Sequence, residues 1–267
     1  MATKVWLGTT DSNPATAGNW SPSGQPTSGD NVIITGSNAI DGGTLSASGN
    51  LASFITRDFA STIGSEDADL VVDLAASSLV SIDTAGKSYL DFNASDVDVN
   101  VHGTQVAGGT IMGLHLKGAG TNSLNVYNSA NVLLLETLDA DINTFSASAT
   151  VITAVGADAV NFTGPGKLIA RGGLTNIYAN GSTVDYYGST ACTTIQAESG
   201  ATINFWASQD VTNVNAYGGT IDLKDSTAAR VSTNNDVRAG GTIIFGRNWT
   251  PTNNPGSATS YQISAAA

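Results

Sequence analysis

Four lines of the sequence repeat one pattern: GSTVDY at 181–186, GATINF at 200–205, GTIDL at 219–223 and GTIIF at 241–245. Each line begins with glycine and continues as a short strand in which β-branched or aromatic side chains alternate with small polar ones. The central apolar residues are Val184, Ile203, Ile221 and Ile243, spaced by nineteen, eighteen and twenty-two residues. A near-constant period of about twenty residues, with strands of roughly four to six residues, is typical of a solenoid. The pattern predicts an all-β protein, a right-handed parallel β-helix.

The same alternation is present earlier in the chain. The stretch 97–101 reads VDVNV, which predicts a strand with valine facing inward and aspartate or asparagine facing outward. Stretches 123–127, 150–155 and 160–162 repeat this mixture of β-branched and polar residues. No helical period of 3.6 residues competes with it, so we expect short strands along most of the chain.

Composition restricts the possible partners. Charged residues make up 12% of the chain, about half the usual share of roughly 25%. The formal net charge is −12, and the ten basic residues are scattered singly. An acidic surface of this kind argues against binding to nucleic acid or to an anionic membrane. The single cysteine, Cys192, cannot form an intrachain disulfide and is predicted to be a small buried side chain.

Two tryptophans mark the N-terminal stretch 3–35, which predicts a strand, a long polar loop, a Pro/Gly turn and a second strand. Trp6 and Trp20 have two interpretations. They cover the open end of the solenoid, where the first turn would otherwise expose its core, or they anchor a protein interface. We favour the cap. The sequence Asn-Trp-Ser-Pro at 19–22 returns as Asn-Trp-Thr-Pro at 248–251, which suggests a second tryptophan cap at the other end.

The N-terminal motif resembles the opening segment of many parallel β-helix proteins. It consists of Trp-x-Gly at 6–8, Asn-Trp-Ser-Pro at 19–22 and Gly-Asp-Asn-Val-x-Ile at 29–34. Similar segments occur in adhesin-like and autotransporter-like passengers of bacteria. They also occur in small β-helical proteins of tailed bacteriophages, including capsid decoration (cement) proteins and head or tail fibres. The motif begins within a few residues of Met1, and the stretch before it lacks the apolar core of a secretory signal, which favours the phage group.

This resemblance implies a structural virion protein, made in the host cytoplasm and located on the capsid surface. We expect it to bind and stabilise the lattice of the major capsid protein, without catalysis and without a cofactor. Family habit and apolar residues at outward-facing positions suggest a homotrimer. The rival functions are a phage tail spike or fibre that binds or cleaves a host glycan, and a bacterial surface adhesin passenger.

Three segments follow from this interpretation. Residues 1–36 form an N-terminal cap and docking segment, 37–247 the β-helix, and 248–267 a C-terminal cap and extended tail, because the repeat breaks after Phe245. Docking is expected at the ends of the solenoid, chiefly the N-terminal end. The candidate partner-binding residues are Trp6, Trp20, Pro22, Pro26 and Trp249.

A glycan groove is the alternative site. Aromatic side chains stack on sugars and carboxylates flank them in β-helices that cleave glycans. The candidate groove residues lie on neighbouring predicted turns: Asp185, Tyr187, Glu198, Trp206 and Asp210. The competing interpretation, which we favour, is that Tyr186 points inward while Tyr187 and Trp206 pack outward against a neighbouring chain.

Metal sites are not expected. The aspartates Asp67, Asp69, Asp73, Asp96 and Asp98 could hold calcium only if further oxygen ligands complete a shell of about six to eight. We favour a solvated outer face. His102 and His115 stand thirteen residues apart with no second ligand at metal spacing, which argues against zinc.

Overall fold

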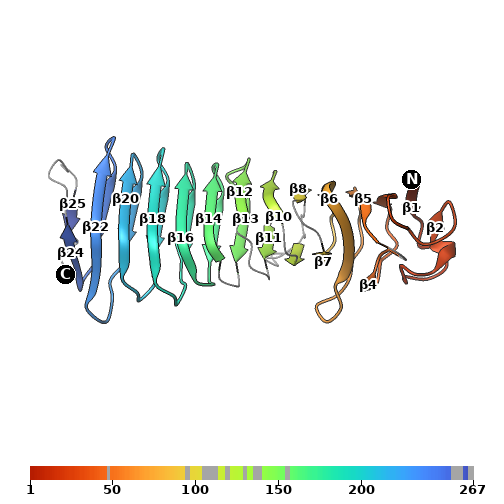
Figure 1. Ribbon diagram of the computed structural model, residues 1–267, viewed down its shortest axis with the longest axis horizontal. Helices are drawn as coiled ribbons and strands as arrows, with labels where there is room; N and C mark the ends of the chain where they lie inside the picture. Colours follow the sequence, from red (N-terminus) through yellow and green to blue (C-terminus); the bar gives the residue numbers. More distant parts are fainter. Residues whose placement is uncertain are drawn as a thin grey trace. The chain divides into compact units, whose positions relative to one another are not determined.

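The computed structural model describes residues 1–46, 49–93, 97–103, 114–117, 121–128, 131–134, 140–153, 157–253 and 261–263. The protein is all-β and about 1% helical, and its parallel strands stack as a β-solenoid of about 10 turns (Figure 1). The predicted fold class is confirmed. Among the described residues, no helix has the length and apolar character needed to span a membrane.

Contacts divide the chain into two compact units, Met1–Leu138 and Asp139–Ala267. In each unit, a turn of the solenoid contributes one strand to a sheet that we call A and one to a sheet that we call B. The expected boundaries after residues 36 and 247 are not tested by this division and stay predictions.

The first unit begins with a small cap. Strand β1 (Thr3–Trp6) pairs in parallel with β3 (Asn31–Thr35) on one side. On its other side it pairs antiparallel with β2 (Trp20–Ser21), which follows the 3-10 turn η1 (Ala17–Asn19). The antiparallel partner covers the edge that the first parallel strand would otherwise expose.

Sheets A and B of the first unit continue from this cap by parallel pairing. The remaining strands are β4 (Gly43–Thr44), β5 (Leu51–Arg57), β6 (Leu70–Asp83), β7 (Ser88–Asn93), β8 (Val97–Gly103), β9 (Leu114–Lys117), β10 (Thr121–Val126) and β11 (Asn131–Leu134). Strand β6 is 14 residues long and belongs to both sheets, pairing with β7 in sheet B and with β5 and β8 in sheet A. Ser77 adopts a φ of 60° between Leu74 and Leu79, where the register of β6 with β5 shifts.

The second unit alternates between the sheets more regularly. Its sheet A strands are β12 (Ala140–Thr144), β14 (Ala157–Thr163), β16 (Leu174–Asn180), β18 (Cys192–Glu198), β20 (Val211–Tyr217), β22 (Arg230–Arg238) and β24 (Trp249–Asn253). Its sheet B strands are β13 (Thr150–Thr153), β15 (Lys167–Ala170), β17 (Thr183–Tyr186), β19 (Thr202–Phe205), β21 (Thr220–Leu223), β23 (Thr242–Phe245) and β25 (Tyr261–Ile263).

The four repeated lines form the predicted register in sheet B. Val184 lies opposite Ile203, Ile203 opposite Ile221, and Ile221 opposite Ile243. Because side chains alternate along a strand, these residues and the next-but-one residues, such as Tyr186 and Phe205, all point into the core. Each of these six side chains is at most 1% exposed, so similar apolar side chains lie above one another in neighbouring strands.

Glycines at the corners have two different physical reasons. Gly200 and Gly240 have φ values of +82° and +76°, a conformation that residues with a Cβ rarely adopt. Gly241 has no such φ, but a Cβ there would lie 2.1 Å from the carbonyl oxygen of Ala216. The glycine that opens the last repeated line is therefore required by the close approach of the preceding turn.

The strand ladder does not end at Phe245, where the sequence pattern breaks. Strand β24 pairs in parallel with β22, and β25 pairs with β23. Within the predicted tail, residues 261–263 join the ladder, where Tyr261 takes the position opposite Ile243. Residues 254–260 and 264–267 lie outside the described residues.

Candidate binding surfaces

The N-terminal tryptophans are buried within their own chain. Trp6 is 1% exposed and Trp20 is 2% exposed, and their rings meet edge to face with centroids 5.1 Å apart. The indole Nε1 of Trp6 donates to the carbonyl oxygen of Asn38 at 2.9 Å, and that of Trp20 to Pro14 at 2.8 Å. Every polar atom of the two indoles is thus used inside the cap.

Two of the other predicted docking residues, Trp249 and Pro26, are buried as well, and Pro22 is exposed. Trp249 is 7% exposed, and its Nε1 donates to the carbonyl oxygen of Lys224 at 2.8 Å. The three indoles fill the space that a further turn of core would occupy, and partner binding by these residues stays a prediction. The cap interpretation agrees with this geometry.

The residues of the predicted glycan groove lie on different faces of the solenoid. Asp185 lies on the outer face of sheet B, and Tyr187 and Trp206 directly follow strands of that sheet. Glu198 ends β18 on the outer face of sheet A, before the corner at 199–201. Asp210 lies on the next corner, where its Oδ1 accepts a hydrogen bond from the Val231 N–H at 2.8 Å. The five residues do not converge on one groove.

Tyr187 and Trp206 form an exposed aromatic stack. Tyr187 is 48% exposed and Trp206 50%, while Tyr186 is fully buried, as predicted. The two rings are nearly parallel, with an interplanar angle of 6° and centroids 6.0 Å apart. Lys224 places its Nζ 5.1 Å from the Trp206 ring centroid, within the range of a cation–π contact. We call Arg171, Tyr187, Trp206 and Lys224 the aromatic row.

Backbone hydrogen bonds fix the positions of the aromatic row. The N–H of Tyr187 donates to the Ala170 carbonyl at 2.8 Å, and that of Trp206 to the Tyr186 carbonyl at 2.9 Å. Each residue of the row therefore continues the sheet B ladder by one position beyond the strand. The stack is held by the solenoid rather than by a free loop, so its side chains are presented at the spacing of neighbouring strands.

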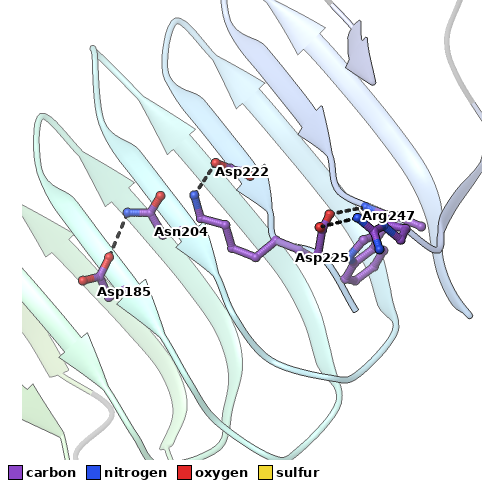
Figure 2. Close-up of polar contacts among 7 residues, drawn as sticks. Asp185, Asn204, Asp222, Asp225 and Arg247 are labelled. Atoms are coloured by element: carbon purple, nitrogen blue, oxygen red, sulfur yellow. Dashed lines mark hydrogen bonds and ion pairs between the residues drawn. The ribbon is translucent and has the colours of Figure 1, made fainter. Parts of the chain in front are cut away.

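A polar row runs beside it on the outer face of sheet B. Figure 2 shows Asn204 directed at Asp185, with its Nδ2 donating to Oδ1 at 2.8 Å. Asp185 also pairs with Lys167 at 2.7 Å, and Asp222 pairs with Lys224. Asp185 is thus bonded by side chains of the two adjacent turns, and Asp222 by a lysine of its own turn.

The outer face of sheet A carries a hollow of about 220 Å³. It is lined by polar side chains of three successive strands, β14, β16 and β18, with Ala179 at its floor. The polar lining residues are Asn161, Thr163, Tyr178, Asn180, Gln196 and Glu198. Glu198 was a candidate groove residue from the sequence, whereas Tyr178, which lines the same hollow, was not.

A second hollow of about 360 Å³ lies on sheet A of the first unit. Its lining mixes the apolar Leu79, which is 54% exposed, with the charged residues Arg57 and Asp83 and with His102. The imidazole of His102 stacks on Tyr127 with centroids 4.6 Å apart, so this histidine has a packing role.

The aspartates that were predicted as an acidic group in the first unit bond to separate side chains. Asp69 pairs with Lys117, Asp73 accepts from Asn93 Nδ2 at 2.9 Å, and Asp98 accepts from Ser123 Oγ at 2.7 Å. Asp96 lies outside the described residues. Across the described ranges, no group of three His, Cys, Asp or Glu side chains is placed to hold a metal ion.

Asp30 and Asp11, two carboxyl groups with lowered pKa values, lie in the N-terminal cap. Burial opposes ionisation of Asp30, but hydrogen bonds from the Ala2 N–H at 2.6 Å and from Thr27 lower its pKa overall. Hydrogen bonding from Asn19, partly offset by desolvation, lowers the pKa of Asp11. Both groups are stabilised as carboxylates, which suits turn formation and not proton donation.

No protein-family model, curated protein or solved structure matches this chain.

Proposed function

We propose that this protein is a structural component of a bacteriophage virion that decorates and stabilises the capsid lattice. The resemblance of its N-terminal motif supports this function. The observation that carries the proposal is the aromatic stack of Tyr187 and Trp206, a large exposed aromatic surface on a repetitive scaffold.

The aromatic row has the composition of a protein-contact hot spot. Tryptophan, tyrosine and arginine dominate the binding energy of protein interfaces, and they act when water is excluded around them. Tyr187 and Trp206 are already ordered by stacking and by the ladder, so binding would immobilise few additional rotamers. Lys224 packs over Trp206 and pairs with Asp222, so it extends this strip without adding net positive charge, and Arg171 flanks the strip at its other end.

Lattice contact is therefore proposed along the side of the second unit instead of at the tryptophan-capped end. The homotrimer stays part of the proposal, and sedimentation equilibrium of the purified chain tests it directly. A monomer at micromolar concentration would contradict the trimer without contradicting lattice binding.

Co-sedimentation with capsids that lack this protein tests the lattice function. We expect the wild-type chain to pellet with capsids and the double variant Tyr187→Ala, Trp206→Ala to lose at least tenfold in affinity, because alanine removes both aromatic surfaces. Phe145→Ala is the matched control, since Phe145 is another exposed aromatic of the second unit at 57% exposure. Equal pelleting of all three proteins, or no pelleting of the wild type, would refute the proposal.

A further inference from the structure

We propose that the hollow on the outer face of sheet A in the second unit binds a neutral glycan, with one sugar ring seated over Tyr178. This site is separate from the aromatic row and does not depend on the capsid-decoration proposal. Three observations support it: the chemistry of the lining, the groups left available in it, and its charge.

The lining is rich in groups that recognise sugar hydroxyls. Asn161, Asn180 and Gln196 carry amides that both donate and accept, and Glu198 supplies a carboxylate. Tyr178 contributes an aromatic ring, whose face can pack on the apolar C–H face of a pyranose. A small number of placed polar groups beside an aromatic surface is typical of ligand sites that fix orientation.

Some of these groups are oriented by neighbours and others are available. Gln196 Nε2 donates to Glu198 Oε1 at 2.5 Å, and Asn215 Nδ2 donates to Gln196 Oε1 at 3.3 Å. Asn161 Nδ2 donates to Asp141 Oδ1 at 2.6 Å. Within the described part of the chain, no side chain forms a hydrogen bond with Glu198 Oε2, the Tyr178 hydroxyl or the side-chain amide of Asn180. These three groups come from two adjacent strands, β16 and β18.

Charge selects the class of glycan. Glu198 is the charged residue of the lining, and no lining residue is basic. A polysaccharide with carboxylate, sulfate or phosphate groups would place like charge against Glu198, which is unfavourable in a half-buried site. A neutral sugar instead donates its hydroxyls to the carboxylate, a charge-assisted hydrogen bond that is stronger than one between neutral groups.

The size of the hollow indicates how much of the glycan it holds. Its 220 Å³ is below the roughly 300–1,000 Å³ of pockets that enclose a whole drug-sized ligand. The hollow therefore suits one ring of a longer chain. The ladder extends this polar face beyond the hollow, because Gln196 lies opposite Asn215 and Asn215 opposite Asp236. Neighbouring sugars would lie across these side chains.

Binding of soluble hexasaccharides to the full-length chain tests the inference. The probes are maltohexaose, cellohexaose and chitohexaose, with hexagalacturonate as the acidic comparison, measured by isothermal titration calorimetry. We expect at least one neutral hexasaccharide to bind and hexagalacturonate to bind at least tenfold more weakly. Tyr178→Ala and Glu198→Gln should each weaken the neutral hexasaccharide at least tenfold.

Two controls separate this site from the proposed capsid contact. Trp206→Ala should leave hexasaccharide binding unchanged, while Tyr178→Ala should leave capsid co-sedimentation unchanged. Far-ultraviolet circular dichroism and thermal unfolding check that each variant is folded. The inference is overturned if no neutral hexasaccharide binds, if the acidic probe binds as tightly, or if Trp206→Ala weakens binding as much as Tyr178→Ala.

Discussion

Single residues in the core of the second unit combine polar atoms with complete burial. Tyr186 is fully buried, and its hydroxyl accepts from the Leu174 N–H at 3.1 Å and donates to the Thr190 carbonyl at 3.3 Å. Cys192 is 1% exposed, and its Sγ donates to the carbonyl oxygens of Thr175 at 3.4 Å and Thr194 at 3.5 Å. Such residues stabilise the fold only while their polar atoms stay paired and uncharged.

The Tyr186→Phe variant tests the paired hydroxyl. It keeps the ring but leaves the buried Leu174 N–H without its partner, so we expect the free energy of unfolding to fall by about 1–3 kcal/mol. Urea denaturation measures this change. Tyr187→Phe, at the exposed neighbour, should change it by less than about 0.5 kcal/mol. Equal effects of the two substitutions would show that the hydroxyl of Tyr186 contributes nothing.

Alkylation of Cys192 tests its burial. Burial raises the pKa of this thiol to about 12, partly offset by a backbone hydrogen bond. At pH 8, only about 10⁻⁴ of the native protein would then carry the thiolate that reacts. We expect iodoacetamide to modify Cys192 in denaturant and to leave the native chain unmodified, as measured by intact mass. Rapid modification of the native protein would contradict this.

The same shift has a consequence for stability. A thiol whose pKa is higher in the folded than in the unfolded state contributes to the free energy of unfolding. This contribution is complete at pH values below 9.0, the pKa of the thiol in the unfolded chain. That contribution declines as pH rises from about 9 through about 12. The Cys192→Ala variant should therefore lose less stability than the wild type across this range.

At the scale of elements, the sequence predicted sheet B well and sheet A less well. The sheet B lines share β-branched residues at one register, so their period was visible. In sheet A, Asn235 takes the core position opposite Val214 and is fully buried, donating to the carbonyls of Ser232 and Asn253. An asparagine there interrupts the apolar pattern, and its Nδ2 finds these acceptors only in the folded chain.

The candidate site shows a similar limit. Sequence spacing placed Tyr187 and Trp206 on adjacent turns correctly, because both follow the regular sheet B lines. It also grouped Glu198 with them, since only twelve positions along the chain separate Glu198 from Asp210. The corner after Glu198 directs the chain to the other sheet, and Tyr178 reaches the same hollow from twenty residues earlier because Tyr178 and Asn180 pair with Gln196 and Glu198.

The corner between β22 and β23 gives a prediction at this scale. Gly241→Ala would place a Cβ 2.1 Å from the Ala216 carbonyl, so the turns must separate, and we expect a loss near the upper end of about 1–3 kcal/mol or more. Gly240→Ala is the matched control. No atom lies within 4 Å of its added Cβ, and the φ of +76° alone costs about 1–2 kcal/mol. Chemical denaturation of both variants measures the difference, and a larger loss at Gly240 would be inconsistent with the close-approach argument.

At the scale of the whole molecule, stability in a solenoid is the sum of interactions between neighbouring turns, so the ends determine where unfolding begins. The chain closes its first unit with Trp6 and Trp20 and covers the last turns of its second unit with Trp249, which meets Phe205 edge to face at 6.0 Å. Each indole donates its N–H to a backbone carbonyl. The caps should therefore control local unfolding within their own units.

Hydrogen exchange of Trp20→Ala and Trp249→Ala tests this control of local unfolding. Removing a buried tryptophan costs about 3–5 kcal/mol, because a cavity replaces the indole and its hydrogen bond is lost. In Trp20→Ala we expect amide protection to fall in β1, β3 and β5, the strands next to the cap, while β17 to β21 keep theirs. In Trp249→Ala protection should instead fall in β22 and β24, with β1 and β3 unchanged. These losses should stay local because each turn is coupled chiefly to its nearest neighbours. A uniform loss of protection along the whole chain in either variant would mean that the protein unfolds as one cooperative body. The tryptophans would then not be local caps.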